Sequence, residues 1–211
     1  MAAEARLAAI VLAGGRARRL GGVDKPGIKL GQRSLAGAVV MAATQAGVSR
    51  VVIVGPERPE LAAELAGDAV TAIEYTCERP AGAGPVPALR AGLDLVTEPR
   101  LLLLAADLPF LTAAALRGLV EAAGEDRGAV LADPTGRSQW LMSCWRTADL
   151  RVAVAGYAGS SLRGLLEPLP HVEVAAALVP GEPPYWLDCD TPEDVAAAER
   201  LGRHPISKEQ P

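Results

Sequence analysis

The sequence predicts a three-layer α/β/α protein built on a mostly parallel sheet. Short apolar runs alternate with longer stretches rich in Ala and Leu, which is the pattern of strands followed by helices. The apolar runs are continuous, as expected for strands that are buried on both faces of a parallel sheet. Half of the residues are hydrophobic, with only three Trp, three Tyr and one Phe, so Ala, Val, Leu and Ile must fill the core. Right-handed connections between the strands then place helices on both faces.

The first half of the chain supplies the alternating part of this pattern. Strands are predicted over residues 7–13, 49–55, 69–75 and 100–107. Helices are predicted over residues 34–47, 59–67, 84–96 and 112–124. Gly47 ends the first helix, and a proline lies near the start of the third, where its missing N–H costs little. Thr112 stands at the N-cap of the fourth, where its hydroxyl can accept a hydrogen bond from a free backbone N–H.

The second half has a weaker pattern. Residues 128–145 predict two strands joined by a turn at Asp133–Arg137, which gives the C-terminal half a small strand hairpin. The remaining predicted elements are helices over 146–155 and 160–167, a strand over 170–179 and a helix over 191–202. The last helix has Thr191 as its cap, Pro192 as its first residue, two acids in its first turn and Gly202 at its end.

Length, charge and cysteine usage narrow the class of protein. We expect a single domain over residues 1–202 and a polar C-terminal tail over 203–211. The formal net charge of −4 gives no reason to expect a nucleic acid partner. Three scattered cysteines without a CxxC pair predict free thiols in a reducing cytoplasm. No apolar run approaches ~18 residues, so we expect no membrane span.

The stretch LAGGRARRLGGVDK, residues 12–25, predicts an anion site. It places four cations and four glycines at the end of the first strand, and ligands of open parallel sheets bind beyond the carboxyl ends of strands. Gly14 and Gly15 have no Cβ atom, so a phosphate can approach their backbone N–H groups. The four cations of the stretch are Arg16, Arg18, Arg19 and Lys25.

Two familiar phosphate motifs are absent from the sequence. Neither GxxxxGK[ST] nor GxGxxG follows the first strand, which argues against a Walker-type NTPase and a nicotinamide-dependent reductase. The loop is longer and more basic than two phosphates need, and it indicates a triphosphate. A tight turn followed by a solvated basic face is the alternative, which so much local charge in an acidic protein disfavours.

Asp107 is the candidate metal ligand. It ends the strand of AADLPFL and should point into the same crevice as Gly14. A carboxylate beside a triphosphate suits Mg²⁺, which prefers oxygen ligands and keeps several waters. Asp107 could instead cap the following helix, but Thr112 is better placed for that task.

The segment LAGGRARRLGGVDKPGIKLGQRSL resembles the signature of the nucleotidyltransferase family that includes the molybdenum cofactor guanylyltransferases. The positions that match the family pattern are Leu12, Ala13, Gly14, Gly15, Arg19, Gly21, Asp24 and Lys25. The resemblance continues through GPVPAL, AADLPFL and DCDTPED, and so covers nearly the whole chain. It implies a Rossmann-like sheet of the GT-A type and a cytoplasmic, Mg²⁺-dependent enzyme.

The resemblance also implies roles for individual residues. Arg19 and Lys25 would hold the triphosphate and its developing charge, while Asp107 would hold the metal ion, with Asp190 as a second metal ligand. The nucleotide would contact Leu12, Ala13, Gly14, Gly15, Arg16, Lys25, Glu78, Gly82, Gly84 and Asp107. The loop over residues 77–89 would hold the base and sugar. The acidic position of that loop matches poorly, with Glu78 between Cys77 and Arg79, which leaves the base preference open.

Further polar residues are candidates for the second substrate. Asp188 and Asp190 face the same side of an extended chain, near a metal or the acceptor, although Asp190 could simply belong to the helix entry. Segment 136–145 resembles the family's acceptor segment, and Arg163 matches a basic position of some relatives. The polar residues of that segment are Arg137, Ser138 and Gln139. Each of these residues could equally be a surface residue.

The predicted reaction is transfer of GMP from GTP to the terminal phosphate of molybdopterin bearing molybdenum, with release of pyrophosphate. An anionic phosphate oxygen needs no activated Ser, Cys or His, so alignment and charge neutralisation would supply the catalysis. One alternative keeps the chemistry but uses CTP or another nucleotide, or a sugar or alditol phosphate acceptor. Another is a non-catalytic module that binds and delivers nucleotide or cofactor. Transient contact with other cofactor-biosynthesis proteins or with molybdoenzymes is also expected.

Overall fold

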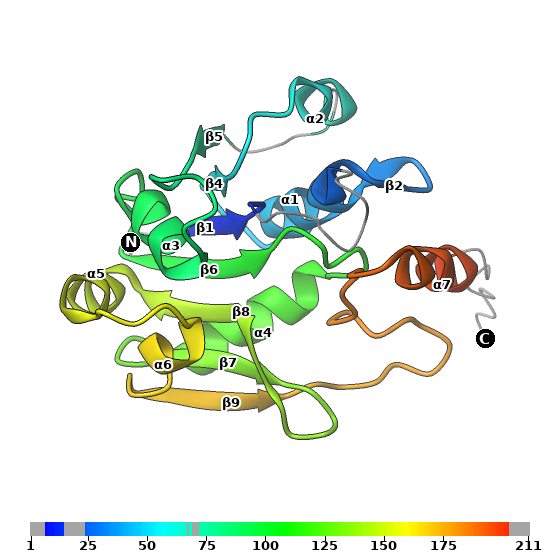
Figure 1. Ribbon diagram of the computed structural model, residues 1–211. Helices are drawn as coiled ribbons and strands as arrows, with labels where there is room; N and C mark the ends of the chain where they lie inside the picture. Colours follow the sequence, from blue (N-terminus) through cyan, green and yellow to red (C-terminus); the bar gives the residue numbers. More distant parts are fainter. Residues whose placement is uncertain (1–6, 15–23, 67, 69–71, 203–211) are drawn as a thin grey trace, which may run out of the picture.

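A computed structural model describes residues 7–14, 24–66, 68 and 72–202 of the chain. Its main sheet has seven strands in the order β5-β4-β1-β6-β8-β7-β9 (Figure 1). The strands are β1 (Leu7–Leu12), β4 (Arg50–Val54), β5 (Ala72–Thr76), β6 (Arg100–Ala105), β7 (Gly128–Ala132), β8 (Ser138–Arg146) and β9 (His171–Ala175). All of them run in one direction except β8, which is antiparallel to both neighbours. The predicted mostly parallel sheet is therefore confirmed.

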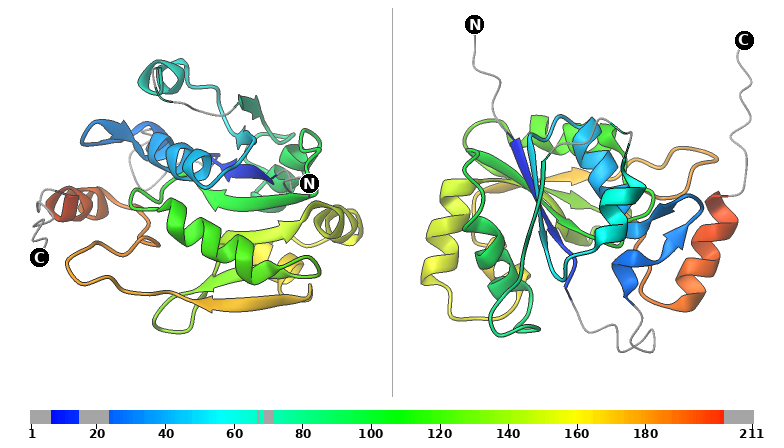
Figure 2. Two further views of the ribbon diagram at one scale, coloured as in Figure 1. Left: turned by 180° about the vertical axis from the view of Figure 1, so that it is seen from behind. Right: turned by 90° about the horizontal axis from the view of Figure 1, so that it is seen from above.

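Helices cover both faces of this sheet, as predicted (Figure 2). They are α1 (Leu35–Gln45), α2 (Pro59–Glu64), α3 (Pro85–Leu93), α4 (Ala113–Ala123), α5 (Thr147–Gly156), α6 (Leu162–Leu166) and α7 (Pro192–Gly202). One core packs α1, α2 and α4 against the sheet, and a second core packs α3, α5 and α6 against the opposite face. The side chains of β1 alternate between the two cores, with Ala9 and Val11 in the first and Ala8 and Ile10 in the second. This two-sided burial explains the continuous apolar run.

The predicted capping residues are confirmed at α4 and α7. The Thr112 hydroxyl accepts a hydrogen bond from the Ala115 N–H at 3.2 Å. Thr191 and Asp194 cap each other, since Asp194 N–H donates to the Thr191 hydroxyl at 3.1 Å and Thr191 N–H donates to the Asp194 carboxylate at 2.7 Å. The Asp194 carboxylate also accepts a hydrogen bond from the Asp190 N–H at 3.0 Å, at the point where the chain enters α7.

The hairpin of residues 128–145 is confirmed, but its place in the sheet was not predicted. β8 lies between β6 and β7 in the sheet. The chain therefore forms β7 two strand positions away from β6, and β8 then fills the position between them. A small second hairpin of β2 (Lys29–Leu30) and β3 (Arg33–Ser34) follows the short 3-10 turn η2 (Lys25–Gly27). Apolar periodicity predicts neither feature, because both elements are short or depend on partners distant in the sequence.

Several predicted boundaries are wrong at the carboxyl ends of elements. The helix expected to reach residue 96 ends at Leu93, and the strand expected to reach residue 179 ends at Ala175. The strand expected to include Asp107 ends at Ala105, which leaves Asp107 in the turn that follows. The predicted strand 69–75 appears as β5, and its first residues, 69–71, lie outside the described part. Among the helices that the structure describes, none is long and apolar enough to cross a membrane.

Candidate active site

The carboxyl ends of the central strands build one edge of the site. Ala13, just beyond β1, donates its N–H to the Val54 carbonyl of β4 at 2.9 Å. Gly55 has φ +154°, and a Cβ atom there would lie 2.8 Å from the Ala13 carbonyl, so the two strand ends approach this closely only with glycine. Gly14 is exposed beyond this contact, with the Glu78 carboxylate beside it. Gly14 is thus the last described residue before the predicted anion loop, and the loop itself lies outside the described residues.

Three charged side chains from distant segments meet at this edge. The Lys25 ammonium donates to Asp107 Oδ2 at 2.5 Å and to Asp190 Oδ1 at 2.6 Å. Lys25 comes from the turn η2, Asp107 from the turn after β6, and Asp190 from the loop before α7. The side chains of Lys25 and Asp107 are only 16% and 20% exposed, whereas that of Asp190 is 53% exposed. We refer to these three residues as the lysine–aspartate cluster.

The electrostatics of the lysine–aspartate cluster favour the charged form of Lys25. Burial by itself would lower the pKa of Lys25, but the hydrogen bonds and charges of Asp107 and Asp190 outweigh burial and raise this pKa. The pKa of Asp188 is also raised, first by burial and then by the charges of Asp190 and Asp107. Asp107 Oδ1 is buried and has no hydrogen-bond partner among the described residues. The cluster thus retains one buried carboxylate oxygen that is free to accept a hydrogen bond or bind a cation.

A cavity of about 370 Å³ opens beside the lysine–aspartate cluster. Its walls include Asp107, Leu108, Arg137, Ser138, Gln139, Trp140, Leu141, Met142, Leu162, Trp186, Asp188 and Asp190. Residues of β8 line this cavity because β8 pairs directly with β6, the strand that precedes Asp107. The expectation that Asp188 and Asp190 share a side of the chain is confirmed, since both line this cavity. The Arg163 side chain, in contrast, is 71% exposed and pairs with Glu167.

The polar residues of the hairpin differ in what they can offer a ligand. Asp133 accepts hydrogen bonds from Thr135 and from the Arg137 N–H, and these bonds, led by that from the Thr135 hydroxyl, lower the pKa of Asp133 to about 2. Gln139 donates to Asp133 at 2.8 Å, and Ser138 donates to Glu173 at 2.7 Å. The Arg137 guanidinium has no side-chain hydrogen bond or ion pair within the described ranges. It is therefore the cation of this wall that remains open to a ligand.

The loop after β5 is organised around Glu78. Its buried carboxylate accepts a hydrogen bond from the Gly82 N–H at 2.7 Å. Gly82 and Gly84 have positive φ values of 78° and 109°, which suit glycine, and Gly84 precedes the first turn of α3. Cys77 is an exposed free thiol. Glu78 is thus the residue that fills the acidic position of this loop, and its carboxylate lies next to Gly14.

Part of the predicted site lies outside the described residues. This part comprises Gly15, Arg16, Arg18, Arg19 and Gly21. The residues immediately before and after this part are described, and Arg58 contacts both of these flanking regions. The Arg58 guanidinium contacts both the Ala13 carbonyl and the Asp24 carboxylate. Sequence reasoning missed Arg58, although an arginine soon after the end of a parallel strand was a usable signal.

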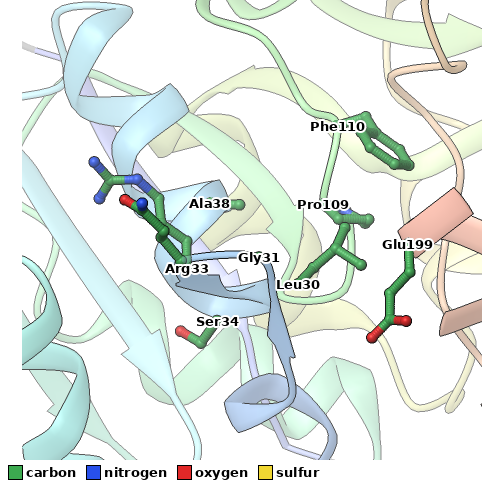
Figure 3. A pocket seen from close by; sticks show the side chains of 9 residues that line it. Leu30, Gly31, Arg33, Ser34, Ala38, Pro109, Phe110 and Glu199 are labelled. Carbon is green, nitrogen blue, oxygen red and sulfur yellow. The ribbon is translucent and has the colours of Figure 1, made fainter. Parts of the chain in front are cut away.

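A larger cavity of about 550 Å³ lies elsewhere on the molecule (Figure 3). It is formed by the β2–β3 hairpin, the start of α1, the Pro109–Phe110 turn and Glu199 of α7. None of the residues of the lysine–aspartate cluster lines it. We therefore assign the chemistry to the smaller cavity, where the charged groups converge.

The sheet and its charged carboxyl edge define a nucleotide-binding α/β protein. The model of the MobA-like NTP transferase domain matches residues 9–174, and the chain belongs to this family of nucleotidyltransferases. The chain is 30% identical over 209 residues to a molybdenum cofactor guanylyltransferase of Bradyrhizobium sp. (strain ORS 278), covering 91% of each protein. It is also 30% identical over 207 residues to the enzyme of that name from Rhodopseudomonas palustris (strain BisB5), covering 92% of each.

Solved structures share the fold. A nucleotidyl transferase from Methanothermobacter thermautotroptrophicus superposes with a TM-score of 0.74 at 22% identity, covering 94% of this chain and 98% of that one. A Mycobacterium tuberculosis protein, Rv0371C, solved in complex with manganese, superposes with a TM-score of 0.66 at 21% identity, covering 92% and 98%. The predicted three-layer nucleotidyltransferase fold is confirmed by these likenesses.

Proposed function

We propose that this chain transfers GMP from GTP to the phosphate of a molybdenum-bearing molybdopterin and releases pyrophosphate. The observation that carries the proposal is the lysine–aspartate cluster, whose two aspartates line the cavity beside β8. The names of the curated relatives support the choice of guanine nucleotide and of acceptor.

The geometry suits a reaction that needs alignment and charge neutralisation. The acceptor's phosphate oxygen is already anionic, so no general base has to remove a proton from it. Lys25 supplies a half-buried positive charge at the point where the α-phosphorus and the leaving pyrophosphate would lie. A fixed charge in a partly desolvated site stabilises developing negative charge more strongly than the same charge in water.

The residues present fit a divalent cation with few protein ligands. Asp107 contributes a buried oxygen without a partner, and Asp190 brings a second carboxylate to the same place. No group of three His, Cys, Asp or Glu side chains in the described ranges forms a complete metal cage. One or two carboxylates, with water and phosphate oxygens completing the shell, is the usual arrangement for Mg²⁺. When bound, the cation would neutralise the phosphate oxygens during the displacement.

The cavity beside β8 is the proposed acceptor site. Its volume of about 370 Å³ falls within the range of roughly 300–1,000 Å³ that is typical of small-molecule pockets. Trp140 and Trp186 offer aromatic surface for a flat heterocycle, and the open guanidinium of Arg137 suits an acceptor phosphate. The three cysteines are free thiols, which supports a reducing cytoplasm as the place of action.

A nucleotide panel tests this function. We expect GTP with Mg²⁺ to raise the melting temperature most, because a ligand at 100 times its Kd stabilises a protein by about 2.7 kcal/mol. Pyrophosphate release should require GTP, Mg²⁺ and the molybdenum-bearing acceptor together. Release with CTP in place of GTP would favour the alternative nucleotide. Binding of nucleotide without any release would favour a delivery module.

Removal of the Lys25 charge should strengthen metal binding in the absence of nucleotide. Lys25 occupies Asp107 Oδ2 and Asp190 Oδ1, so Lys25→Met leaves two carboxylates without their counter-ion. We expect the Kd for Mn²⁺, measured from the spin-resonance signal of the free ion, to fall about tenfold, or roughly 1.4 kcal/mol. Lys29→Met is the control, because Lys29 is 60% exposed and lies 3.9 Å from Glu64 instead. Equal Mn²⁺ affinities in wild type and Lys25→Met would contradict the assigned metal site.

A further inference from the structure

Arg58 is a buried cation that no step of the proposed reaction uses. It follows β4 and precedes α2, and its side chain is 8% exposed. Its guanidinium forms a two-pronged pair with Asp24, from Nε to Oδ2 at 2.8 Å and from Nη2 to Oδ1 at 2.6 Å. It also donates to the Ala13 carbonyl at 3.2 Å and to the Pro56 carbonyl at 2.9 Å. All three nitrogens of the guanidinium are therefore engaged.

These contacts join two points that border the basic segment over residues 15–23. Ala13 lies at the end of β1, immediately before Gly14, and Asp24 lies immediately before Lys25. Without Arg58, the described contacts between these two points would be lost. The guanidinium thus contacts the chain on both sides of the segment that separates Gly14 from Lys25.

Gly27 lies directly against the Asp24 carboxylate. A Cβ atom on Gly27 would lie 2.6 Å from Asp24 Oδ2, so a larger residue would push the carboxylate away from Arg58. The Gly27 N–H also donates to the Asp24 carbonyl at 3.0 Å, which closes the turn that begins at Lys25. The sequence DKPG therefore combines the partner of Arg58 with the lysine of the site.

We propose that Arg58 is a positioning residue of the active site. Through the Ala13 carbonyl and the Asp24 carboxylate it sets where the Gly14 N–H and the Lys25 ammonium meet the phosphates of the nucleotide. It touches no reacting atom itself. A lysine cannot replace it, because a point charge cannot form the planar two-pronged pair and also reach both carbonyls. This inference rests on the proposed function of the site.

Arg50, the first residue of β4, provides a matched control. It stands at the opposite end of β4, is also partly buried, and pairs with Glu98 and Glu74. An arginine that serves only the fold should behave as Arg50 does. Arg50→Ala therefore removes a guanidinium at the start of β4, and Arg58→Ala removes one from the loop after β4, where only the second removal affects the proposed site.

The kinetic test compares these variants in pyrophosphate release with GTP and the acceptor. We expect Arg58→Ala to lower kcat/KM for GTP about a hundredfold and to raise KM, because small displacements of positioning groups have effects of this size. Methylguanidinium at millimolar concentration should restore part of the activity of Arg58→Ala, whereas Arg58→Lys should stay impaired. Arg50→Ala should keep kcat/KM within about threefold of wild type and show no rescue. Equal kinetic losses in the two alanine variants would overturn the proposal.

Two further measurements keep the result clear if Arg58→Ala folds poorly. Gly27→Ala retains both charges but displaces the Asp24 carboxylate, and we expect it to raise KM for GTP in the same direction. Hydrogen exchange without nucleotide should be faster in Arg58→Ala at residues 12–14 and 24–28, and unchanged there in Arg50→Ala. Unchanged exchange would refute the positioning role even if the wild type turned over no nucleotide. Absence of turnover in the wild type would instead refute the proposed function.

Discussion

Replacement of Asp107 by Asn should abolish most pyrophosphate release and leave the protein folded. The change removes the negative charge that faces Lys25 and replaces one carboxylate oxygen by an amide NH₂, which cannot bind a metal ion. Loss of one such electrostatic contact commonly costs about 3 kcal/mol of transition-state stabilisation, so we expect a fall of roughly 10²–10³ in kcat. Asp107→Ala should behave in the same way.

The fold should survive because the Asp107 side chain has Lys25 as its described partner, while its backbone carbonyl keeps the Cys189 N–H at 3.2 Å. The melting temperature should stay within a few degrees of wild type. Asp68→Asn is the control, since Asp68 pairs with Arg33 away from the site. Wild-type turnover in Asp107→Asn would remove Asp107 from the mechanism.

Replacement of Lys25 by Met should have the second largest effect. The side chain keeps its length but loses the charge between Asp107 and Asp190. We expect kcat to fall by about 10²–10³ and KM for GTP to rise, because the lysine neutralises the triphosphate as well as the developing charge. Pyrophosphate release at saturating GTP and Mg²⁺ measures both constants.

The combination of results is more diagnostic than either alone. Lys25→Met should bind Mn²⁺ more tightly and still turn over poorly, which separates holding the metal from neutralising the phosphates. Lys25→Arg should recover little, because a planar guanidinium cannot occupy the position of a compact ammonium 2.5 Å and 2.6 Å from two carboxylates. Normal kcat in Lys25→Met would show that Lys25 only balances charge in the free protein.

Most of the fold could be predicted because the burial of each strand or helix determines which of its residues are apolar. β1 contributes side chains to two cores, so LAAIVL had to be apolar throughout. The capping residues Thr112 and Thr191 act on N–H groups within three residues, and such local contacts are readable without a structure. The boundaries near Asp107 were less accurate, since strand pairing and not residue type decides where β6 ends.

Two parts of the candidate site could be predicted for the same reason. Gly14 and Asp107 both follow apolar strands, and the carboxyl ends of parallel strands meet at one edge. The position of β8 could not be predicted, because an antiparallel return between β6 and β7 depends on pairing between distant segments. That insertion is what brings Arg137 and Trp140 beside Asp107.

The amino-acid sequence by itself determined the layered sheet, the helix caps and the acid that follows β6, because each depends on residues that are neighbours in the chain. Only the tertiary structure decided that Lys25 would lie between Asp107 and Asp190, residues 82 and 165 positions away along the chain. It also decided that Arg58 would pair with Asp24 and that Glu78 would lie beside Gly14. Such contacts join side chains whose separation is set by the packing of the whole sheet. A pattern of neighbouring residues therefore cannot predict them.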